Sequence, residues 1–100
     1  MPAITQLTRY KSGNHDEMVK AAKKAKGIYE KHGAEFFRVS RFHTGNFAGE
    51  WLVVSRYASW AAYAKAQEAL AKDDEFQKLL AHVLSVAEMT ARNVTVGIDL

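Results

Sequence analysis

The pattern of apolar and polar positions changes several times along the chain and predicts four strands separated by helical regions. The first strand is rich in β-formers, and the last places Val94, Val96, Ile98 and Leu100 on one face. The two middle strands flank a glycine-rich turn, which is typical of a β-hairpin. The predicted strands are residues 3–10, 34–44, 50–57 and 89–100.

The first helical region lies between the first two strands. Glu17 follows Asn14 at the spacing of a capping box, so we expect the helix to begin there. Apolar residues then recur at helical spacing as far as His32. Gly33 stands where a left-handed residue commonly ends a helix.

The second helical region begins at Ser59 and is interrupted at residues 72–74, where we expect Asp74 to cap a further helical segment. The resulting order is β-α-β-β-α-β. This order predicts an α+β fold of the ferredoxin-like type, with a four-stranded antiparallel sheet and two helices on one face. We expect residues 1–100 to form a single domain of this kind.

Large apolar side chains occur on both faces of the middle strands. Phe36 and Phe42 point to one face of strand 34–44, whereas Phe37 and Val39 point to the other. Sixteen of the 100 residues are Ala, so the core of one chain is thin. Because helices cover only one face of the sheet, we expect a homodimer in which the other faces pack against each other.

The composition excludes several classes of protein. The chain has no Cys, which excludes disulfides, thiolate metal sites and iron–sulfur clusters. Its four His lack the short spacing of a ligand pair, so we expect no metal and no cofactor. The net charge is only +3 and no RNA-stacking motif occurs, so we expect no nucleic-acid partner. We expect a cytoplasmic protein, because no segment has the pattern of a membrane span or a signal peptide.

The chain resembles the dimeric α/β-barrel superfamily, and in particular its NIPSNAP-like and antibiotic-biosynthesis-monooxygenase-like members. The resemblance rests on the element order, on residues 56–60 (Arg-Tyr-Ala-Ser-Trp) and on the helical pattern of residues 59–76. It implies a dimer with a pocket between sheet and helices in each subunit. Heme-degrading relatives carry Asn in the first strand, where this chain has Thr8 and Arg9. Fold alone does not decide among the activities of this superfamily.

His43 and Arg41 are the candidate catalytic residues, because both belong to predicted strand 34–44 near its turn. The hairpin register decides their neighbours. In one register Glu50 lies opposite His43, which gives an oriented base with Arg41 or Arg56 as a stabiliser of an anion or enolate. A slip of one residue brings Trp51 to that face instead. A plain cross-strand charge pair is the other interpretation of these residues.

Aromatic residues near the junction of strand 50–57 and the second helical region could line a pocket for a ring-shaped substrate, or form ordinary core. The candidate substrate-binding residues are Trp51, Arg56, Tyr57, Trp60, Tyr63 and His82. These residues are compatible with two functions. The first is a small-molecule pocket serving a cofactor-independent monooxygenase or isomerase, and the alternative is a non-catalytic dimeric module for ligand binding or assembly.

Overall fold

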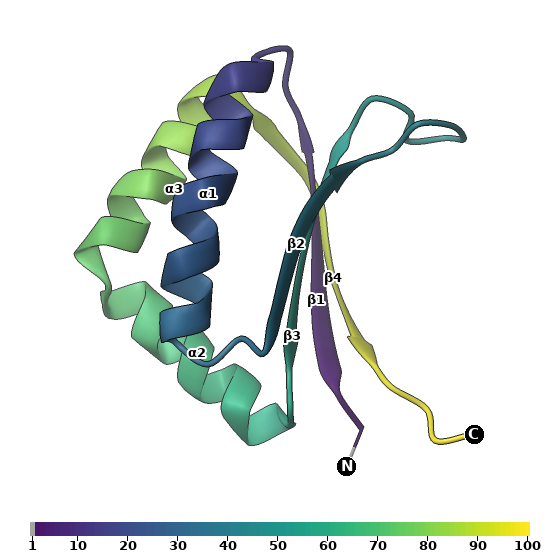
Figure 1. Cartoon of the computed structure of the whole chain (residues 1–100), viewed down its shortest axis with the longest axis vertical. Coiled ribbons are helices and arrows are strands. Elements are labelled where there is room, and N and C mark those ends of the chain that lie inside the picture. The colour runs from purple at the N-terminus through teal and green to yellow at the C-terminus, as the bar shows by residue number, and fades with distance from the viewer. Residues whose placement is uncertain (1) are drawn as a thin grey trace.

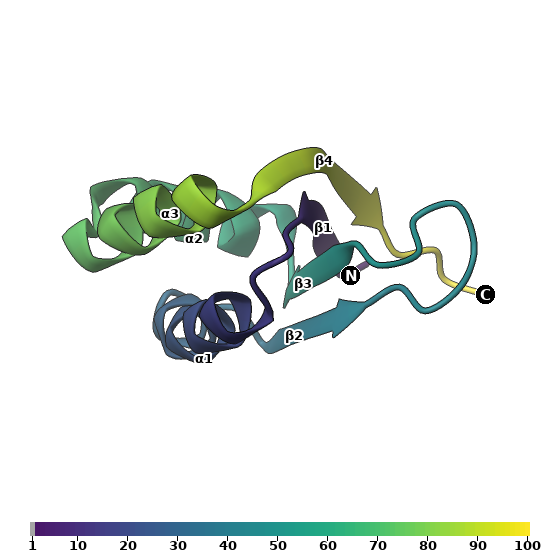
Figure 2. The ribbon, with the colours of Figure 1, turned by 90° about the horizontal axis from the view of Figure 1, so that it is seen from above.

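The computed structural model describes residues 2–100 and contains four strands and three helices (Figure 1). In chain order they are β1 (Ile4–Lys11), α1 (His15–Lys31), β2 (Phe36–Arg41), β3 (Trp51–Tyr57), α2 (Trp60–Lys72), α3 (Asp74–Val86) and β4 (Glu88–Val96). The strands form one antiparallel sheet in the order β2-β3-β1-β4. All three helices lie on one side of this sheet (Figure 2). The predicted ferredoxin-like α+β fold is therefore confirmed.

Burial along β1 explains how the sheet receives its helical layer. Every second residue from Ile4 to Tyr10 is buried, and the residues between them are only half-buried. Successive side chains of a strand point to opposite faces, so Ile4, Thr8 and Tyr10 lie under the helices. The opposite side of the sheet is called here the open face, and from β1 it receives Leu7 and Arg9.

Local capping explains the bounds of the helices. The side chain of Asn14 accepts a hydrogen bond from the Glu17 amide at 3.3 Å, and Gly33 adopts φ 101°, as both patterns predict. The second helical region breaks into α2 and α3, but the prediction that Asp74 caps α3 is wrong. Asp73 occupies that position, and its carboxylate accepts a hydrogen bond from the Phe76 amide at 3.1 Å.

The hairpin adopts the slipped register. Arg41 pairs with Trp51, and beyond this pair the Phe42 amide donates to the Glu50 carbonyl at 2.9 Å. The alternative register, with His43 opposite Glu50, is therefore wrong. β2 also ends at Arg41, earlier than expected, so that His43 belongs to the loop 42–50. This loop carries positive φ at both of its glycines, which suits a chain reversal rather than continued strand.

The open face carries an apolar surface that nothing within the described residues 2–100 fully covers. Leu7 pairs with Val54, and Leu52 lies on a neighbouring rung of the same ladder. Each of these three side chains is partly exposed. Loop 42–50 covers one end of this face, where the Arg9 guanidinium lies 3.6 Å from the ring centre of Phe47.

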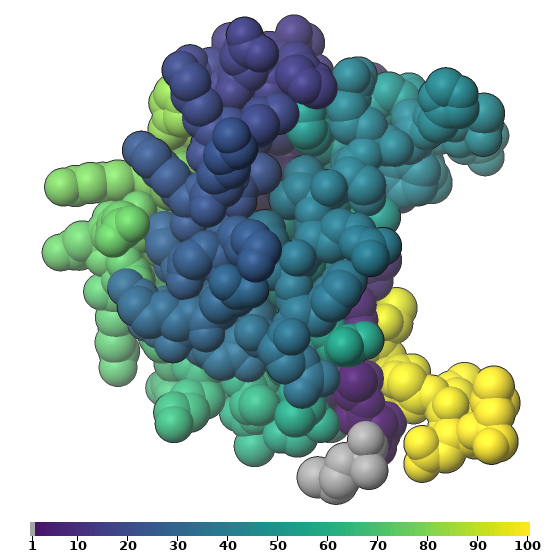
Figure 3. All heavy atoms as spheres, viewed as in Figure 1, coloured from purple at the N-terminus to yellow at the C-terminus, as the bar shows by residue number. Residues whose placement is uncertain are grey.

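The C-terminal residues lie beyond the sheet. β4 ends at Val96, before the predicted strand end at residue 100, and residues 97–100 project from the body of the molecule (Figure 3). Ile98 and Leu100 are highly exposed there. Within residues 2–100, no helix combines the length and the apolar character that a membrane crossing requires.

Candidate functional site

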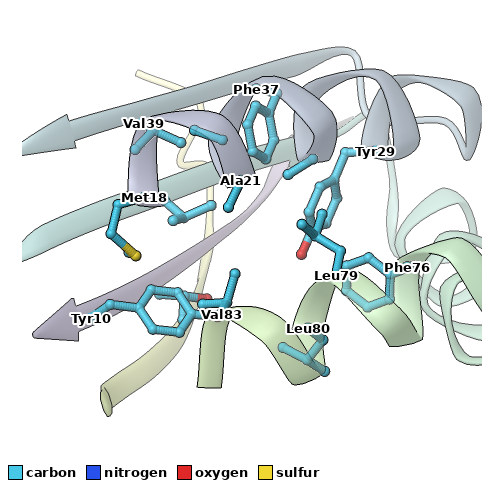
Figure 4. Close-up of a pocket in the computed structure, with 14 residues that line it drawn as sticks. Tyr10, Met18, Ala21, Tyr29, Phe37, Val39, Phe76, Leu79, Leu80 and Val83 are labelled. Atoms are coloured by element: carbon cyan, nitrogen blue, oxygen red, sulfur yellow. The ribbon is translucent and has the colours of Figure 1, made fainter. Parts of the chain in front are cut away.

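A cavity lies between the sheet and the helices α1 and α3 (Figure 4). We call it the main cavity, and its volume is about 60 Å³. From the helices it is lined by Met18, Ala21, Ala22, Ala25, Tyr29, Phe76, Leu79, Leu80 and Val83. From the strands it is lined by Thr8, Tyr10, Phe37, Val39 and Val53. Its lining, mostly apolar with a few hydroxyl groups, has the chemical character of a small-molecule site, but its volume is below the roughly 300–1,000 Å³ of ordinary ligand pockets.

Small residues on α1 leave this space open. Ala21, Ala22 and Ala25 recur at helical spacing on the side of α1 that lines the main cavity. Across the cavity α3 presents larger side chains, including Leu79 and Val83. Because an alanine methyl group reaches only a short distance, the helices can contact each other while space remains between them and the sheet.

Polar groups gather along the β1 side of the cavity. Thr8 and Tyr10 line it from β1. Arg92, an exposed residue of β4 that does not itself line the cavity, donates from its Nε to the Thr8 hydroxyl at 3.2 Å. Burial raises the pKa of the Tyr10 phenol, while the neighbouring Arg92 charge opposes that shift. Burial likewise raises the pKa of Tyr29 well above its ordinary value. Both phenols are therefore neutral near pH 7 and act as hydrogen-bonding groups rather than as bases.

The sequence pattern did not point to these polar groups. It marked Thr8 only as a departure from the heme-degrading pattern, and Arg92 lies 84 positions away from it in the chain. The two residues meet because they are direct partners in the pairing of β1 with β4. Alternation within β1 could have placed Thr8 and Tyr10 on one face, but nothing local indicates which residue of β4 lies opposite.

The candidate catalytic residues lie outside the main cavity. Both Arg41 and His43 are exposed, and neither lines it. The Arg41 Nη2 donates to the Gly49 carbonyl at 3.2 Å, and its guanidinium lies 5.2 Å from the ring centre of Trp51. Trp51 is buried beneath the first half of α1, in a cluster with Tyr10 and Met18. The structure thus places Arg41 beside Trp51, whereas His43 lies in loop 42–50.

The aromatic residues near the start of α2 form a group of their own. The Tyr63 hydroxyl donates to the Gln6 side chain at 2.9 Å, and the Tyr57 hydroxyl donates to Ser55 at 3.3 Å. The Tyr57 and Tyr63 rings meet at 5.3 Å, and the exposed ring of Trp60 packs against the edge of this pair. None of the three lines the main cavity, so the group packs the adjoining part of the core.

The two remaining candidates each contact a carboxylate at the surface. Arg56 lies on the open-face side, with its Nε 3.4 Å from the Glu35 carboxylate. His82 is on α3, and its Nε2 lies 2.8 Å from the Glu17 carboxylate of α1. This hydrogen bond lowers the pKa of Glu17. It also ties together the two helices that border the main cavity.

A second contact between a histidine and a carboxylate joins the C-terminal end of α1 to the start of α3. The His32 Nε2 lies 2.7 Å from the Asp73 carboxylate, which also receives the Lys31 ammonium at 3.2 Å. The hydrogen bond from His32 is the main reason that the pKa of Asp73 lies far below its ordinary value. Among residues 2–100, no group of three or more His, Asp or Glu side chains is arranged to hold a metal ion.

Comparison with known families gives one match at the sequence level. A family model described as "Domain of unknown function (DUF6854)" matches residues 2–97. No curated protein sequence matches the chain.

Several solved structures share the fold. SnoaB from Streptomyces nogalater, described as a cofactor-independent oxygenase, superimposes with a TM-score of 0.71 at 8% identity, covering 100% of this chain and 97% of SnoaB. A NIPSNAP domain protein from Burkholderia xenovorans gives 0.73 at 16% identity, covering 100% and 95%. A dimeric ferredoxin-like protein from an uncultured marine organism gives 0.66 at 15% identity, covering 100% and 99%. The resemblance to NIPSNAP-like and monooxygenase-like proteins is confirmed at the level of the fold.

Proposed function

The chain belongs to the DUF6854 family, and we propose that it binds a small, flat, apolar molecule in the main cavity. The observation that carries the proposal is the cavity itself, an apolar space with Thr8 and Tyr10 on its β1 side, which must widen between α1 and α3 to admit a ring. A ring enclosed between α1 and α3 would lose contact with water on both faces. An oxygen atom on that ring would find the hydroxyls of Thr8 and Tyr10.

The charge of Arg92 indicates what kind of oxygen the ligand carries. A cation beside two hydroxyl groups stabilises an anionic oxygen more than a neutral one. We therefore propose a ligand with an acidic hydroxyl, such as a phenol or an enol, whose ionised oxygen faces Arg92 and Tyr10. Since Tyr10 stays protonated near pH 7, it can donate a hydrogen bond to that oxygen.

Oxygenation without a cofactor is the reaction we propose for such a ligand. SnoaB, which shares the fold, is described as a cofactor-independent oxygenase, and an ionised phenol or enol can itself supply electrons to O₂. In the simplest balance, a CH₂ group of the substrate becomes C=O. One oxygen atom of O₂ enters that carbonyl and the other leaves as water, with both hydrogens of the CH₂ group. Arg92 would favour the ionised substrate that begins this reaction.

His43 and Arg41 stay candidates for a catalytic part. Because both lie outside the main cavity, such a part requires a substrate that extends toward loop 42–50. The alternative function, a ligand-binding or assembly module without catalysis, needs neither residue.

We also propose that the chain acts as a homodimer joined through its open faces. Leu7, Leu52 and Val54 form an apolar centre on this face, and the helical layer lies on the other side of the sheet. A second copy would bury these side chains by packing sheet against sheet. One of the structures with this fold is described as dimeric, which supports the proposal.

The binding proposal is tested by titrating 2-naphthol into the protein and measuring affinity by calorimetry. Replacing Ala25→Leu fills the main cavity and should abolish binding, whereas Ala64→Leu, at an exposed position of α2, should leave it unchanged. Equal affinities for the two variants would overturn the proposal. Oxygen uptake with enolisable aromatic compounds then separates the two functions, since a module without catalysis consumes none.

A further inference from the structure

A second hollow lies outside the main cavity, between α1 and the edge strand β2. Val19, Lys23 and Lys26 line it from α1, and Phe37 and Arg38 line it from β2. We call this hollow the edge groove. β2 is the outermost strand on its side of the sheet, so nothing in the described chain pairs with its free edge. Lys23, Lys26 and Arg38 belong to the edge groove and not to the main cavity.

Trp51 lines the edge groove and holds an unused hydrogen-bond donor. The residue is only 4% exposed, and its indole Nε1 has no acceptor among the described residues. Buried donors nearly always have a partner in folded proteins, because leaving one unpaired costs free energy. An acceptor oxygen on a bound molecule would supply the missing partner.

The charged residues that line the edge groove all carry the same sign. Lys23, Lys26 and Arg38 are cations, and none of the described residues that line the groove is acidic. The Arg38 guanidinium lies on the open face, 5.2 Å from the ring centre of Phe36, so Lys23 and Lys26 supply the charge that faces the groove. The Lys26 ammonium is engaged with the Glu30 carboxylate at 2.8 Å, whereas Lys23 forms no ion pair in the described structure. Positive rims with an apolar floor select ligands that combine an anionic group with an apolar body.

Aromatic and cationic groups also lie beside Trp51, toward the start of α1. The His15 ring lies 5.3 Å from the Trp51 ring, and the Arg41 guanidinium lies 5.2 Å from it. A flat ligand in the edge groove would therefore meet aromatic and cationic groups rather than carboxylates. A carboxylate is the acceptor that suits both an indole N–H and an ammonium group.

We propose that the edge groove is a second binding site, separate from the main cavity, for a small carboxylate with a flat apolar body. Trp51 donates its indole N–H to the carboxylate, Lys23 supplies charge at the rim, and Phe37 contacts the ring. The edge groove shares Ala22, Phe37 and Val39 with the lining of the main cavity, whereas Lys23, Lys26 and Trp51 line the edge groove alone. Because those three residues lie outside the main cavity, the second site does not depend on the function proposed for that cavity.

The test uses 2-naphthoate as the probe and the Trp51 indole N–H resonance as the readout. A Trp60→Phe background leaves Trp51 as the only tryptophan, so one indole signal remains in the ¹H–¹⁵N spectrum. We expect 2-naphthoate to shift this signal in a saturable way. We expect Lys23→Glu to weaken binding about tenfold, since it replaces attraction by repulsion at the rim. Lys24→Glu makes the same charge change at a position that does not line the groove, and should have little effect.

Further outcomes separate this site from the main cavity. Ala25→Leu fills the main cavity and should leave 2-naphthoate binding intact, and the neutral 2-naphthalenemethanol should bind about tenfold more weakly than 2-naphthoate. The proposal fails if Ala25→Leu abolishes 2-naphthoate binding, because the probe then occupies the main cavity. It also fails if the indole signal does not move, or if Lys23→Glu and Lys24→Glu weaken binding equally.

Discussion

The His32 ring and the Asp73 carboxylate meet at 2.7 Å although 41 positions separate them in the chain. Asp73 also caps α3, so one carboxylate both begins a helix and fastens that helix to the end of α1. Together with the His82–Glu17 pair, this contact holds α1 against the helices beside it. Along α1, the residues that line the main cavity lie between Glu17 and His32.

The first prediction concerns acid stability. Because the pKa of Asp73 is lowered in the folded state, its contribution is fully present above the unfolded carboxyl value of about 3.9. The contribution is lost as the pH falls from there toward the folded pKa. Asp73→Asn keeps a capping side chain but removes the charge, so it should destabilise the protein at pH 6 and cost progressively less below about pH 4. Urea unfolding across this range measures the difference, with Asp74→Asn as the control; a pH-independent difference would contradict the prediction.

The second prediction concerns Gly27, which lies inside α1, and Gly33, which follows the end of that helix. Gly33 has φ 101°, so Gly33→Ala should destabilise the protein by about 1–2 kcal/mol. Gly27 lies inside α1, and a methyl group there would meet no atom within 4 Å. Gly27→Ala should therefore stabilise the protein by about 0.5–1 kcal/mol. Thermal unfolding of the two variants should shift in opposite directions, and a shift of equal sign would refute this account.

The third prediction tests the buried hydrogen bond between Tyr63 and Gln6. Gln6 is only 3% exposed, so Tyr63→Phe leaves its carbonyl without that donor and should cost about 1–3 kcal/mol. Adding Gln6→Leu replaces both polar partners and should recover part of the loss. Urea unfolding of the single and double variants provides the measurement. A double variant as unstable as the sum of the single ones would count against the coupling.

The fourth prediction tests the homodimer. Light scattering of the wild type at tens of micromolar should give twice the chain mass of 11.2 kDa, and the Val54→Lys variant should give the chain mass itself. A charge at the apolar centre of the open face would be buried without a partner in the dimer. Leu84→Lys makes the same change at an exposed position of α3 and should leave the dimer intact. A monomeric wild type would refute the interface.

The fifth prediction concerns the charge beside the main cavity. Arg92→Gln should weaken binding of 2-naphthol about tenfold at a pH where its hydroxyl ionises, and should have a smaller effect where it is neutral. The control is Arg38→Gln, which removes a cation from β2 that pairs with Val54 and has no contact with Thr8, whereas Arg92 donates directly to Thr8. Calorimetric titration at the two pH values provides the comparison. Equal losses at both values would mean that Arg92 does not act through its charge.

Local chemistry was enough to predict the elements and their order. The cap formed by Asn14 and Glu17, the left-handed Gly33 and the break before α3 are each written in a few neighbouring residues. Such features depend on backbone hydrogen bonds within one turn of the chain, so they are visible without any knowledge of the fold. The ferredoxin-like order and the two-faced character of the sheet both follow from these elements.

Which side chains share a site depends on contacts between distant parts of the chain. The slipped hairpin register removed His43 from a place opposite Glu50, and the pairing of β1 with β4 brought Arg92 to Thr8. For both strand pairs, a register shifted along the strand would also satisfy the local sequence pattern. The choice between them depends on the packing of the whole helical layer against the sheet, which no short stretch of sequence contains. The main cavity needs that same packing, because its lining comes from five separate elements.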